Sequence, residues 1–272
     1  MTAPTSLRDR FRQHNVCVLI PTYNNEKTLK MVVDSVLHYT EQVLVVNDGS
    51  TDATSAILST YPHLDLVSYE KNVGKGWALR QGFKKALALG YDHAITIDSD
   101  GQHFADDLYK FLDKIEETPN AIIIGARNME QSSVPGKSSF GNKFSNFWFK
   151  VETGLVMKDT QSGYRLYPIR AMEQLKFITL KFEFEIEVLV RSAWRGIAIT
   201  SVPVKVFYAE KGVRVSHFRP FNDFSRISVL NTVLVIIAFL YIKPRDFFRS
   251  IKKKTSDRSS LSYSTHQENP IR

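Results

Sequence analysis

The chain has 272 residues, which is long for one domain and short for two, so we expect one large domain with an appendage. A composition of 43% hydrophobic and 24% charged residues excludes a wholly disordered chain, a collagen-like repeat and a polytopic membrane protein, and the one cysteine, Cys17, excludes a disulfide framework. The net charge of +8 gathers mainly in residues 243–272, which do not resemble the basic folded face of a nucleic-acid-binding protein.

Short apolar runs rich in Val and Ile alternate with helical patterns over the first two thirds of the chain. The runs predict strands at 16–20, 43–46, 64–67, 94–97 and 121–124. Apolar residues spaced three and four apart predict helices at 29–36, 53–58, 77–89 and 108–115, and a helix at 182–195 and a strand at 198–208 follow. This alternation predicts an α/β fold with a mostly parallel central sheet and helices on both faces.

The pattern weakens between residues 128 and 165, a segment rich in Ser, Gly, Lys and aromatic residues. Further on, residues 227–242 form the most apolar stretch and carry no charge; as a helix they span about 24 Å, short of the roughly 30 Å of membrane hydrocarbon. We therefore predict a membrane-associating helical segment over 221–250, as a marginal span or an interfacial helix, with burial in a soluble core as the alternative. The other predicted parts are an N-terminal extension over 1–14, a folded domain over 15–220 and a basic disordered tail over 251–272.

Polar residues follow three of the predicted strands at the point where each strand ends. These are Pro-Thr-Tyr-Asn at 21–24, Asn-Asp-Gly-Ser-Thr-Asp at 47–52 and Asp-Ser-Asp-Gly-Gln-His at 98–103. Ligands of parallel sheets lie beyond the carboxyl ends of the strands, so we expect the three segments to converge on one crevice. Turn chemistry is the alternative, and we favour it for Asp52 as the N-cap of the helix that begins near Ala53.

Asp98 and Asp100 are better explained by a divalent cation. Two carboxylates one residue apart on an extended backbone point to the same side, and they repel each other unless a cation lies between them. Oxygen ligands in a site without cysteine indicate Mg²⁺ or Mn²⁺, which share their coordination shell with substrate phosphates. The pair therefore implies a ligand that contains a diphosphate.

The sequence Asn72-Val-Gly-Lys-Gly76 precedes a predicted helix. Backbone N–H groups at a helix start attract anions, so Gly74 and Lys75 are candidate phosphate ligands, and a simple Gly-rich helix start is the alternative. A Walker loop is not indicated, because Lys75 is followed by Gly rather than by Ser or Thr.

Six motifs occur in one order along the chain: Ile20-Pro-Thr-Tyr-Asn-Asn, Val46-Asn-Asp-Gly-Ser-Thr-Asp52, Asn72-Val-Gly-Lys-Gly76, Ile97-Asp-Ser-Asp-Gly-Gln-His103, Gly125-Ala-Arg127 and Asp159-Thr-Gln-Ser-Gly-Tyr-Arg165. Together they resemble the family 2 glycosyltransferases, most closely the dolichyl- or polyprenyl-phosphate mannose synthase branch. The resemblance covers about residues 15–215 and implies a single GT-A type domain.

The resemblance implies a role for individual residues. Nucleotide-sugar binding is expected of Pro21, Tyr23, Asn25, Asp48, Asp98 and Arg127, joined by Gly74 and Lys75 of the Gly-rich helix start. Asp98, Asp100 and Gln102 match the metal-binding motif, and the expected catalytic residues are Asp98, Asp100, Arg127 and Glu185. The acceptor-side loop comprises Asp159, Gln161, Ser162, Gly163, Tyr164 and Arg165. Asn25 stands where the mannose synthases tend to have Glu, and Glu185 has the alternative of pairing along its helix with Arg191 or Lys181.

The end-of-domain loop of the family, an Arg-x-x-Gly-x-Ser-Lys-like pattern, is altered here to Tyr208-Ala-Glu-Lys-Gly-Val-Arg-Val-Ser-His-Phe-Arg-Pro220. We expect Lys211, Arg214 and His217 of this loop to close over the donor diphosphate. A solvated basic loop is the alternative.

These features predict a metal-dependent inverting glycosyltransferase that moves a sugar from a nucleotide-diphosphate sugar to a membrane lipid acceptor, a polyprenyl phosphate by resemblance, with Mg²⁺ or Mn²⁺ as cofactor. One alternative is the same fold acting on a hydroxyl group of another lipid or of a cell-envelope glycan. The others are a noncatalytic sugar-nucleotide-binding membrane protein and a nucleotidyltransferase. We expect the protein at the cytoplasmic face of the cell membrane, held there by residues 227–242 and the basic tail, with no nucleic-acid partner.

Overall fold

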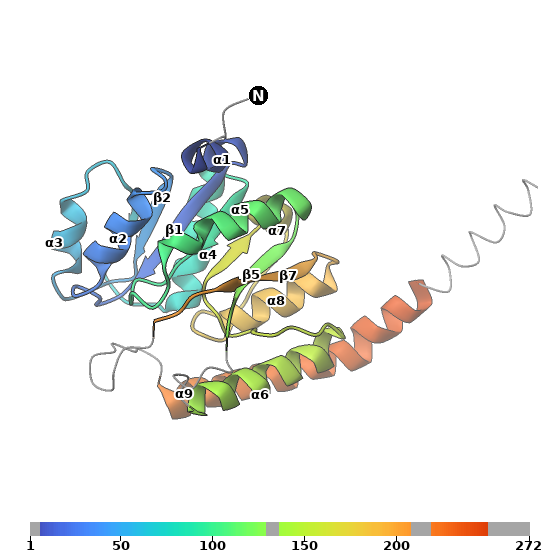
Figure 1. The fold of residues 1–272 in the computed structure, drawn as a ribbon. Helices are drawn as coiled ribbons and strands as arrows, with labels where there is room; N and C mark the ends of the chain where they lie inside the picture. Colours follow the sequence, from blue (N-terminus) through green and yellow to red (C-terminus); the bar gives the residue numbers. More distant parts are fainter. Residues whose placement is uncertain (1–5, 129–135, 208–218, 250–272) are drawn as a thin grey trace, which may run out of the picture.

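The computed structural model describes residues 6–128, 136–207 and 219–249 (Figure 1). The strands are β1 (Val16–Thr22), β2 (Val43–Asn47), β3 (Asp65–Ser68), β4 (His93–Thr96), β5 (Ile122–Arg127), β6 (Arg165–Tyr167) and β7 (Ile199–Val204). The helices are α1 (Leu7–Gln13), α2 (Leu29–Leu37), α3 (Thr54–Ser59), α4 (Lys75–Ala88), α5 (Leu108–Glu117), α6 (Gly136–Thr153), α7 (Ile169–Met172), α8 (Phe184–Trp194) and α9 (Pro220–Ile237). A 3-10 turn spans Ala105–Asp107, and a π-helical turn at Ala238–Ile242 extends α9.

The strands form one sheet in the order β3-β2-β1-β4-β6-β5-β7. Strand β6 is antiparallel to both of its neighbours, and the other pairs are parallel. The predicted α/β fold with a mostly parallel sheet is confirmed, whereas β6 was not predicted because its three residues are too short for a pattern. The carboxyl ends of β1, β2, β4 and β5 therefore lie at the same edge of the sheet.

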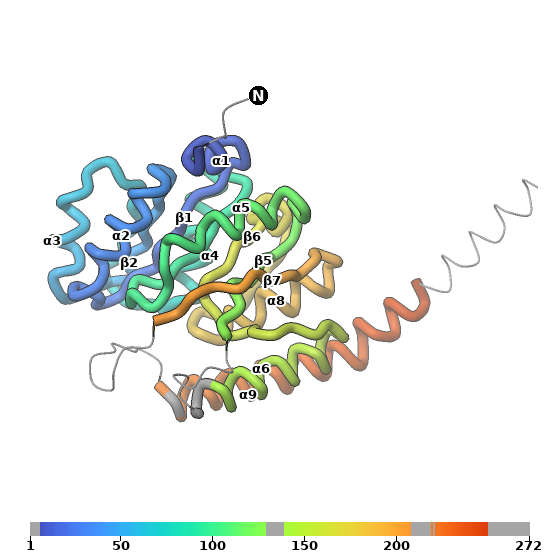
Figure 2. Tube along the Cα trace, in the orientation of Figure 1, coloured from blue at the N-terminus to red at the C-terminus, as the bar shows by residue number. Residues whose placement is uncertain are grey.

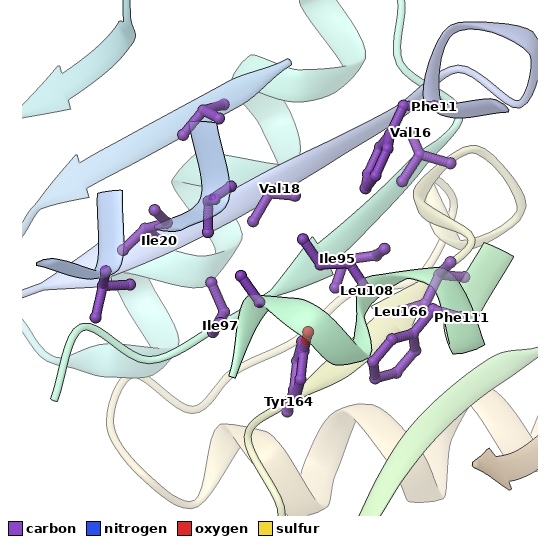
Figure 3. Packing of buried hydrophobic residues seen from close by; sticks show 14 of the residues in the cluster. Phe11, Val16, Val18, Ile20, Ile95, Ile97, Leu108, Phe111, Tyr164 and Leu166 are labelled. Atoms are coloured by element: carbon purple, nitrogen blue, oxygen red, sulfur yellow. The ribbon is translucent and has the colours of Figure 1, made fainter. Parts of the chain in front are cut away.

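The sheet is buried on both faces, as its continuous apolar strands require. Along β1, Val16, Val18 and Ile20 enter one core cluster, and Cys17 and Leu19 enter the other. Figure 3 shows the first cluster, in which Phe11 of α1 packs beside Val16 and Val18. Within the segment 1–14, residues 7–13 thus form a helix that packs on the domain.

Helix α6 occupies part of the segment over which the sequence pattern weakened. The pattern is weak because the buried face of this helix carries Asn142, Ser145 and Glu152 instead of apolar residues. Helix α9 lies beside α6 (Figure 2) and also contacts α8. Its Leu230 and Leu234 join the second core cluster, so the alternative of burial in a soluble core holds for one side of α9 only.

Glu152 is a buried carboxyl group that has no hydrogen-bond partner among the residues that the structure describes. Its residue is 1% exposed, and neither carboxyl oxygen has a hydrogen-bond partner. Burial raises the pKa of Glu152 to about 8 from its ordinary value of 4.5. The folded protein therefore holds this group protonated at neutral pH, whereas the unfolded chain ionises it.

We expect Glu152→Gln to remove part of the pH dependence of folding. Between pH 4.5 and about 8 the unfolded state binds fewer protons at this position, so the native free energy of unfolding falls as the pH rises through this window. The variant should match the native chain near the acid end of the window and exceed it by on the order of 5 kcal/mol near the alkaline end. Chemical denaturation across this range measures the difference, with exposed Glu173→Gln as control. An equal gap at both ends would contradict the neutral buried form.

Candidate functional site

The polar segments after the strands meet at the carboxyl edge of the sheet. Ser99, after β4, donates its hydroxyl to the carbonyl of Pro21 at 3.1 Å. The Nδ2 of Asn25 donates to Ser99 Oγ at 2.8 Å, and both residues are buried. The loops after β1 and β4 are thereby joined, and the convergence expected from the sequence is present.

A partly buried ammonium group lies at the centre of this edge. Lys75 Nζ, at the start of α4, is 2.8 Å and 2.9 Å from the two carboxylate oxygens of Asp98, and 3.0 Å from Glu185 Oε1 on α8. Burial opposes the charge of Lys75, but the two carboxylates outweigh it and raise its pKa. Burial likewise opposes ionisation of Asp98, and Lys75 reverses this and lowers its pKa. Lys75 is thus the counter-cation that Asp98 and Glu185 share.

This arrangement differs from the helix pairing considered for Glu185. Its partner is Lys75 on another element, and Arg191 instead pairs with Glu187 at 2.7 Å. A contact between residues so far apart along the chain gives no local signal in the sequence.

Gly163 lies directly against this ion cluster. A Cβ placed on it would be 2.7 Å from Asp98 Oδ2, 2.9 Å from Lys75 Nζ and 3.1 Å from Glu185 Oε1. The backbone carbonyl of Gly163 also accepts a hydrogen bond from Thr96 Oγ1 at 2.7 Å. The position needs glycine because the backbone approaches the charged groups closely.

Arg127, the last residue of β5, is held by Asp159. Arg127 donates through Nε and Nη2 to the two oxygens of Asp159 at 2.7 Å and 3.0 Å. Asn142 of α6 donates to the same carboxylate at 2.6 Å, and so do the backbone N–H groups of Gln161 and Ser162. Burial of Asp159 opposes its ionisation, but the hydrogen bonds from Arg127 outweigh this and lower its pKa. Asp159 therefore orients Arg127 and the loop around it.

Arg165 is fully buried and stabilises the acceptor-side loop from within. Its guanidinium donates to the carbonyl oxygens of Ser162 at 2.6 Å, Glu185 at 2.8 Å and Thr160 at 2.9 Å. Tyr164 is buried as well and donates its hydroxyl to the carbonyl of Phe104 at 3.2 Å. Among the six residues assigned to this loop, Gln161 is the one that is exposed.

The N–H groups of the Gly-rich helix start are occupied by a carboxylate of the protein itself. Asp48, after β2, accepts hydrogen bonds from the backbone of Val73 at 3.0 Å and of Gly74 at 2.8 Å, and from Asn72 Nδ2 at 2.8 Å. Burial raises the pKa of Asp48, against the effect of these hydrogen bonds. The anion at this helix start is thus Asp48, and the loop and the end of β2 are held together. The N-cap of α3 is Ala53 and not Asp52 as predicted; Asp52, one position earlier, accepts a hydrogen bond from the backbone N–H of Thr54 at 3.0 Å.

The residues present fit a divalent cation that is shared with phosphate. Asp98 and Asp100 follow β4, and Asp100 Oδ1 accepts from the backbone N–H of Gln102 at 3.0 Å. Within the described ranges no three His, Cys, Asp or Glu side chains gather into a metal-binding group. Mg²⁺ is usually held in this way, by one or two carboxylates with substrate phosphates completing the shell.

His103 is a residue of this edge that the sequence analysis did not assign. Its Nδ1 is buried without a hydrogen-bond partner, its ring contacts the ring of Tyr164, and burial lowers its pKa to about 4. His103 is therefore neutral at physiological pH. In the sequence, the position of His103 directly after Gln102 could have indicated that it belongs to the site. The described residues do not include Lys211, Arg214 or His217. Tyr23, the first residue after β1, is partly buried.

Comparisons with known proteins point in one direction. The sequence model described as "Glycosyl transferase family 2" matches residues 17–175. The chain is 30% identical over 219 residues to the UDP-N-acetylglucosamine–dolichyl-phosphate N-acetylglucosaminyltransferase of Methanococcus voltae, covering 72% of this chain and 86% of that protein. It is 29% identical over 209 residues to the polyprenol monophosphomannose synthase of Mycolicibacterium smegmatis, covering 72% of this chain and 78% of that one.

The fold also matches a solved structure. Glucosyl-3-phosphoglycerate synthase from Mycobacterium tuberculosis, in complex with Mn²⁺, UDP-glucose and phosphoglyceric acid, superposes with a TM-score of 0.60 at 19% identity, covering 85% of this chain and 82% of that chain. This likeness confirms the GT-A type fold that was expected from the resemblance.

We expect Gly163→Ala to destabilise the protein through the ion cluster. The added methyl group would overlap Asp98 and Lys75, so one side of the ion pair must shift, at a cost of about 1–3 kcal/mol in the free energy of unfolding. Gly141→Ala on α6 is the matched control, since its nearest contact is Gln161 Oε1 at 3.3 Å and alanine favours a helix interior. Denaturant titration compares the two variants, and equal stability would show that the cluster tolerates the methyl group.

Proposed function

The chain belongs to glycosyl transferase family 2 and is a glycosyltransferase, and we propose that it moves a sugar from a nucleoside-diphosphate sugar to a polyprenyl phosphate in a membrane. The transfer is a single metal-dependent displacement with inversion at the sugar carbon. The names of the two sequence relatives support this acceptor, since one acts on dolichyl phosphate and the other on a polyprenol monophosphate. The single observation that carries the proposal is the pairing of both candidate bases with cations.

The acceptor chemistry follows from those pairs. Asp159 is bound to Arg127 through both oxygens, and Glu185 Oε1 is 3.0 Å from Lys75 Nζ, so each carboxylate is already engaged with a cation of the protein. A hydroxyl acceptor needs a base to take its proton. A phosphate monoester is already anionic near neutral pH and attacks without one. The ion pairs therefore favour a phosphate acceptor over a sugar or lipid hydroxyl.

The donor side must neutralise the diphosphate that leaves. Mg²⁺ or Mn²⁺, held by Asp98, Asp100 and Gln102, would supply Lewis-acid stabilisation of this leaving group. Arg127 adds a cation whose direction is fixed by Asp159 before the donor binds, which is the condition for effective electrostatic stabilisation. We assign the loop with Lys211, Arg214 and His217 to covering the same diphosphate. Asp48 positions the Gly74 loop beneath the nucleotide.

The C-terminal helix supports a membrane location. One continuous helix, Phe221–Arg249, has 29 residues; its most apolar window of 18 residues has a mean hydropathy of 1.9, and 28% of that window is buried in the protein. Most of this apolar surface is therefore uncovered, which is typical of a helix that meets lipid. The basic residues at 243–272 support a cytoplasmic location of this end, by the positive-inside tendency. We propose residues 15–220 as the catalytic domain and 221–250 as its membrane segment.

A donor and acceptor panel tests the reaction. Purified chain with Mn²⁺ is offered a set of radiolabelled sugar nucleotides with polyprenyl phosphate, and with the corresponding polyprenol as the hydroxyl acceptor. We expect label in the phosphate lipid only, and loss of it with EDTA. Asp100→Asn should lower turnover at least about a hundredfold at unchanged stability, because a ligand charge is lost, whereas Asp106→Asn on the exposed surface should be neutral. Transfer to the polyprenol alone would overturn the acceptor assignment.

Substitutions on the uncovered side of α9 test the membrane segment. Truncation before Leu230 would uncover the core, so the exposed Val233, Ile236 and Leu240 are changed to Asn instead. We expect the variant to leave the membrane fraction by about tenfold or more, because lost apolar burial weakens partitioning. Leu66, Leu89 and Tyr109, exposed on other elements, are changed to Asn as the matched control. Unchanged flotation on vesicles would remove α9 from the membrane contact.

A further inference from the structure

Compared with an ordinary surface helix, α6 has a largely polar buried side and exposed aromatic side chains. Positions 142, 145, 149 and 152 are buried, and three of these four side chains are polar. Positions 140, 143, 147 and 150 form the opposite stripe, in which Phe140 is 67% and Phe147 57% exposed. A helix in water buries its aromatic residues and exposes its amides. The medium outside α6 is therefore apolar at least in part.

The outward stripe of α6 continues onto α9. The two helices lie side by side (Figures 1 and 2), and the rings of Phe144 and Phe224 are 5.3 Å apart between centroids. We call the exposed apolar side chains of both helices the α6–α9 face; they are Phe140, Phe147, Phe221, Phe224, Val229, Val233 and Ile236. This face belongs to two segments that are separate in the sequence and adjacent in the fold.

The charges around the α6–α9 face indicate what covers it. Among the described side chains of α6 and α9, the exposed charged ones are Lys143, Lys150 and Arg226, all cationic. The acidic residues of the two helices, Glu152 and Asp223, are buried. A second copy of the chain would place like charges together, which costs free energy, whereas an anionic phospholipid surface complements both the aromatic rings and the cations.

We propose that the α6–α9 face binds the surface of an anionic phospholipid bilayer, with α6 lying in the headgroup region. This rests on the proposed function only in supplying the reason for a membrane, and it adds a contact outside residues 227–242. The buried side of the same helix holds the site: Asn142 donates to Asp159 at 2.6 Å, and Asn146 donates to the carbonyl of Lys158 at 2.8 Å. Helix α6 thus separates the bilayer from the Asp159–Arg127 pair by a single layer, which brings a lipid phosphate close to the donor.

Trp148 provides a native probe of this contact. It lies on α6 beside Phe147, with ring centroids 5.2 Å apart. The full chain is mixed with vesicles of phosphatidylcholine and phosphatidylglycerol, with or without brominated acyl chains, and no sugar nucleotide is added. We expect bromine to quench the fluorescence of the native chain and to quench Trp148→Phe much less. A chain that floats with the vesicles without quenching of Trp148 would overturn the proposal, since α9 alone would then bind.

Two pairs of variants identify the residues. Phe140→Ser with Phe147→Ser should weaken vesicle binding about tenfold or more, and Leu89→Ser with Tyr109→Ser, exposed elsewhere, should not. Lys143→Gln with Lys150→Gln should weaken binding only when phosphatidylglycerol is present, with Lys27→Gln and Lys84→Gln as the control pair. A vesicle-free dimer that the Phe pair dissociates would assign the face to a second copy instead. The vesicle experiments measure binding and not sugar transfer, so their outcome can be interpreted even if the sugar-transfer panel fails.

Discussion

The ion cluster of Lys75 with Asp98 and Glu185 is the constraint on which the site depends. It joins the start of α4, the end of β4 and the start of α8, three elements that no hydrogen-bonded ladder connects to one another. Two partly buried carboxylates next to each other are unstable without a cation, and a partly buried ammonium is unstable without anions. The three groups therefore stabilise one another, and a Cβ on Gly163 would lie 2.7–3.1 Å from all three.

A second ion pair, Arg127 with Asp159, links the end of β5 to the acceptor-side loop. Its carboxylate accepts from a guanidinium, an amide and two backbone N–H groups, so its acceptor capacity is spent within the protein. Charges that are fixed in advance need no reorganisation when a diphosphate arrives. Under the proposed function these fixed charges stabilise anions, which is the property that a phosphate acceptor requires.

Helix α6 connects this electrostatics to the outside of the molecule. Its buried amides hold the loop that orients Arg127, and its exposed rings and lysines lie on the other side. Glu152, neutral in the same helix, shows how far the buried side departs from an apolar core. The inward side of the helix makes polar contacts with the acceptor-side loop, and its exposed rings lie on the side where we propose the bilayer.

The alternation of strands and helices could be predicted from the sequence alone. This alternation implies the mostly parallel sheet and the edge at which Asp48, Asp98 and Arg127 lie. That information is local, because buried strands and capped helices follow from residues a few positions apart. Three features became visible only in the folded structure. Lys75 pairs with Asp98 and Glu185, and the backbone N–H of Gly74 donates to Asp48. Helix α6 exposes two of its aromatic side chains. Each of these depends on which distant group is the nearest counter-charge or neighbour, and spacing along the chain does not encode that distance.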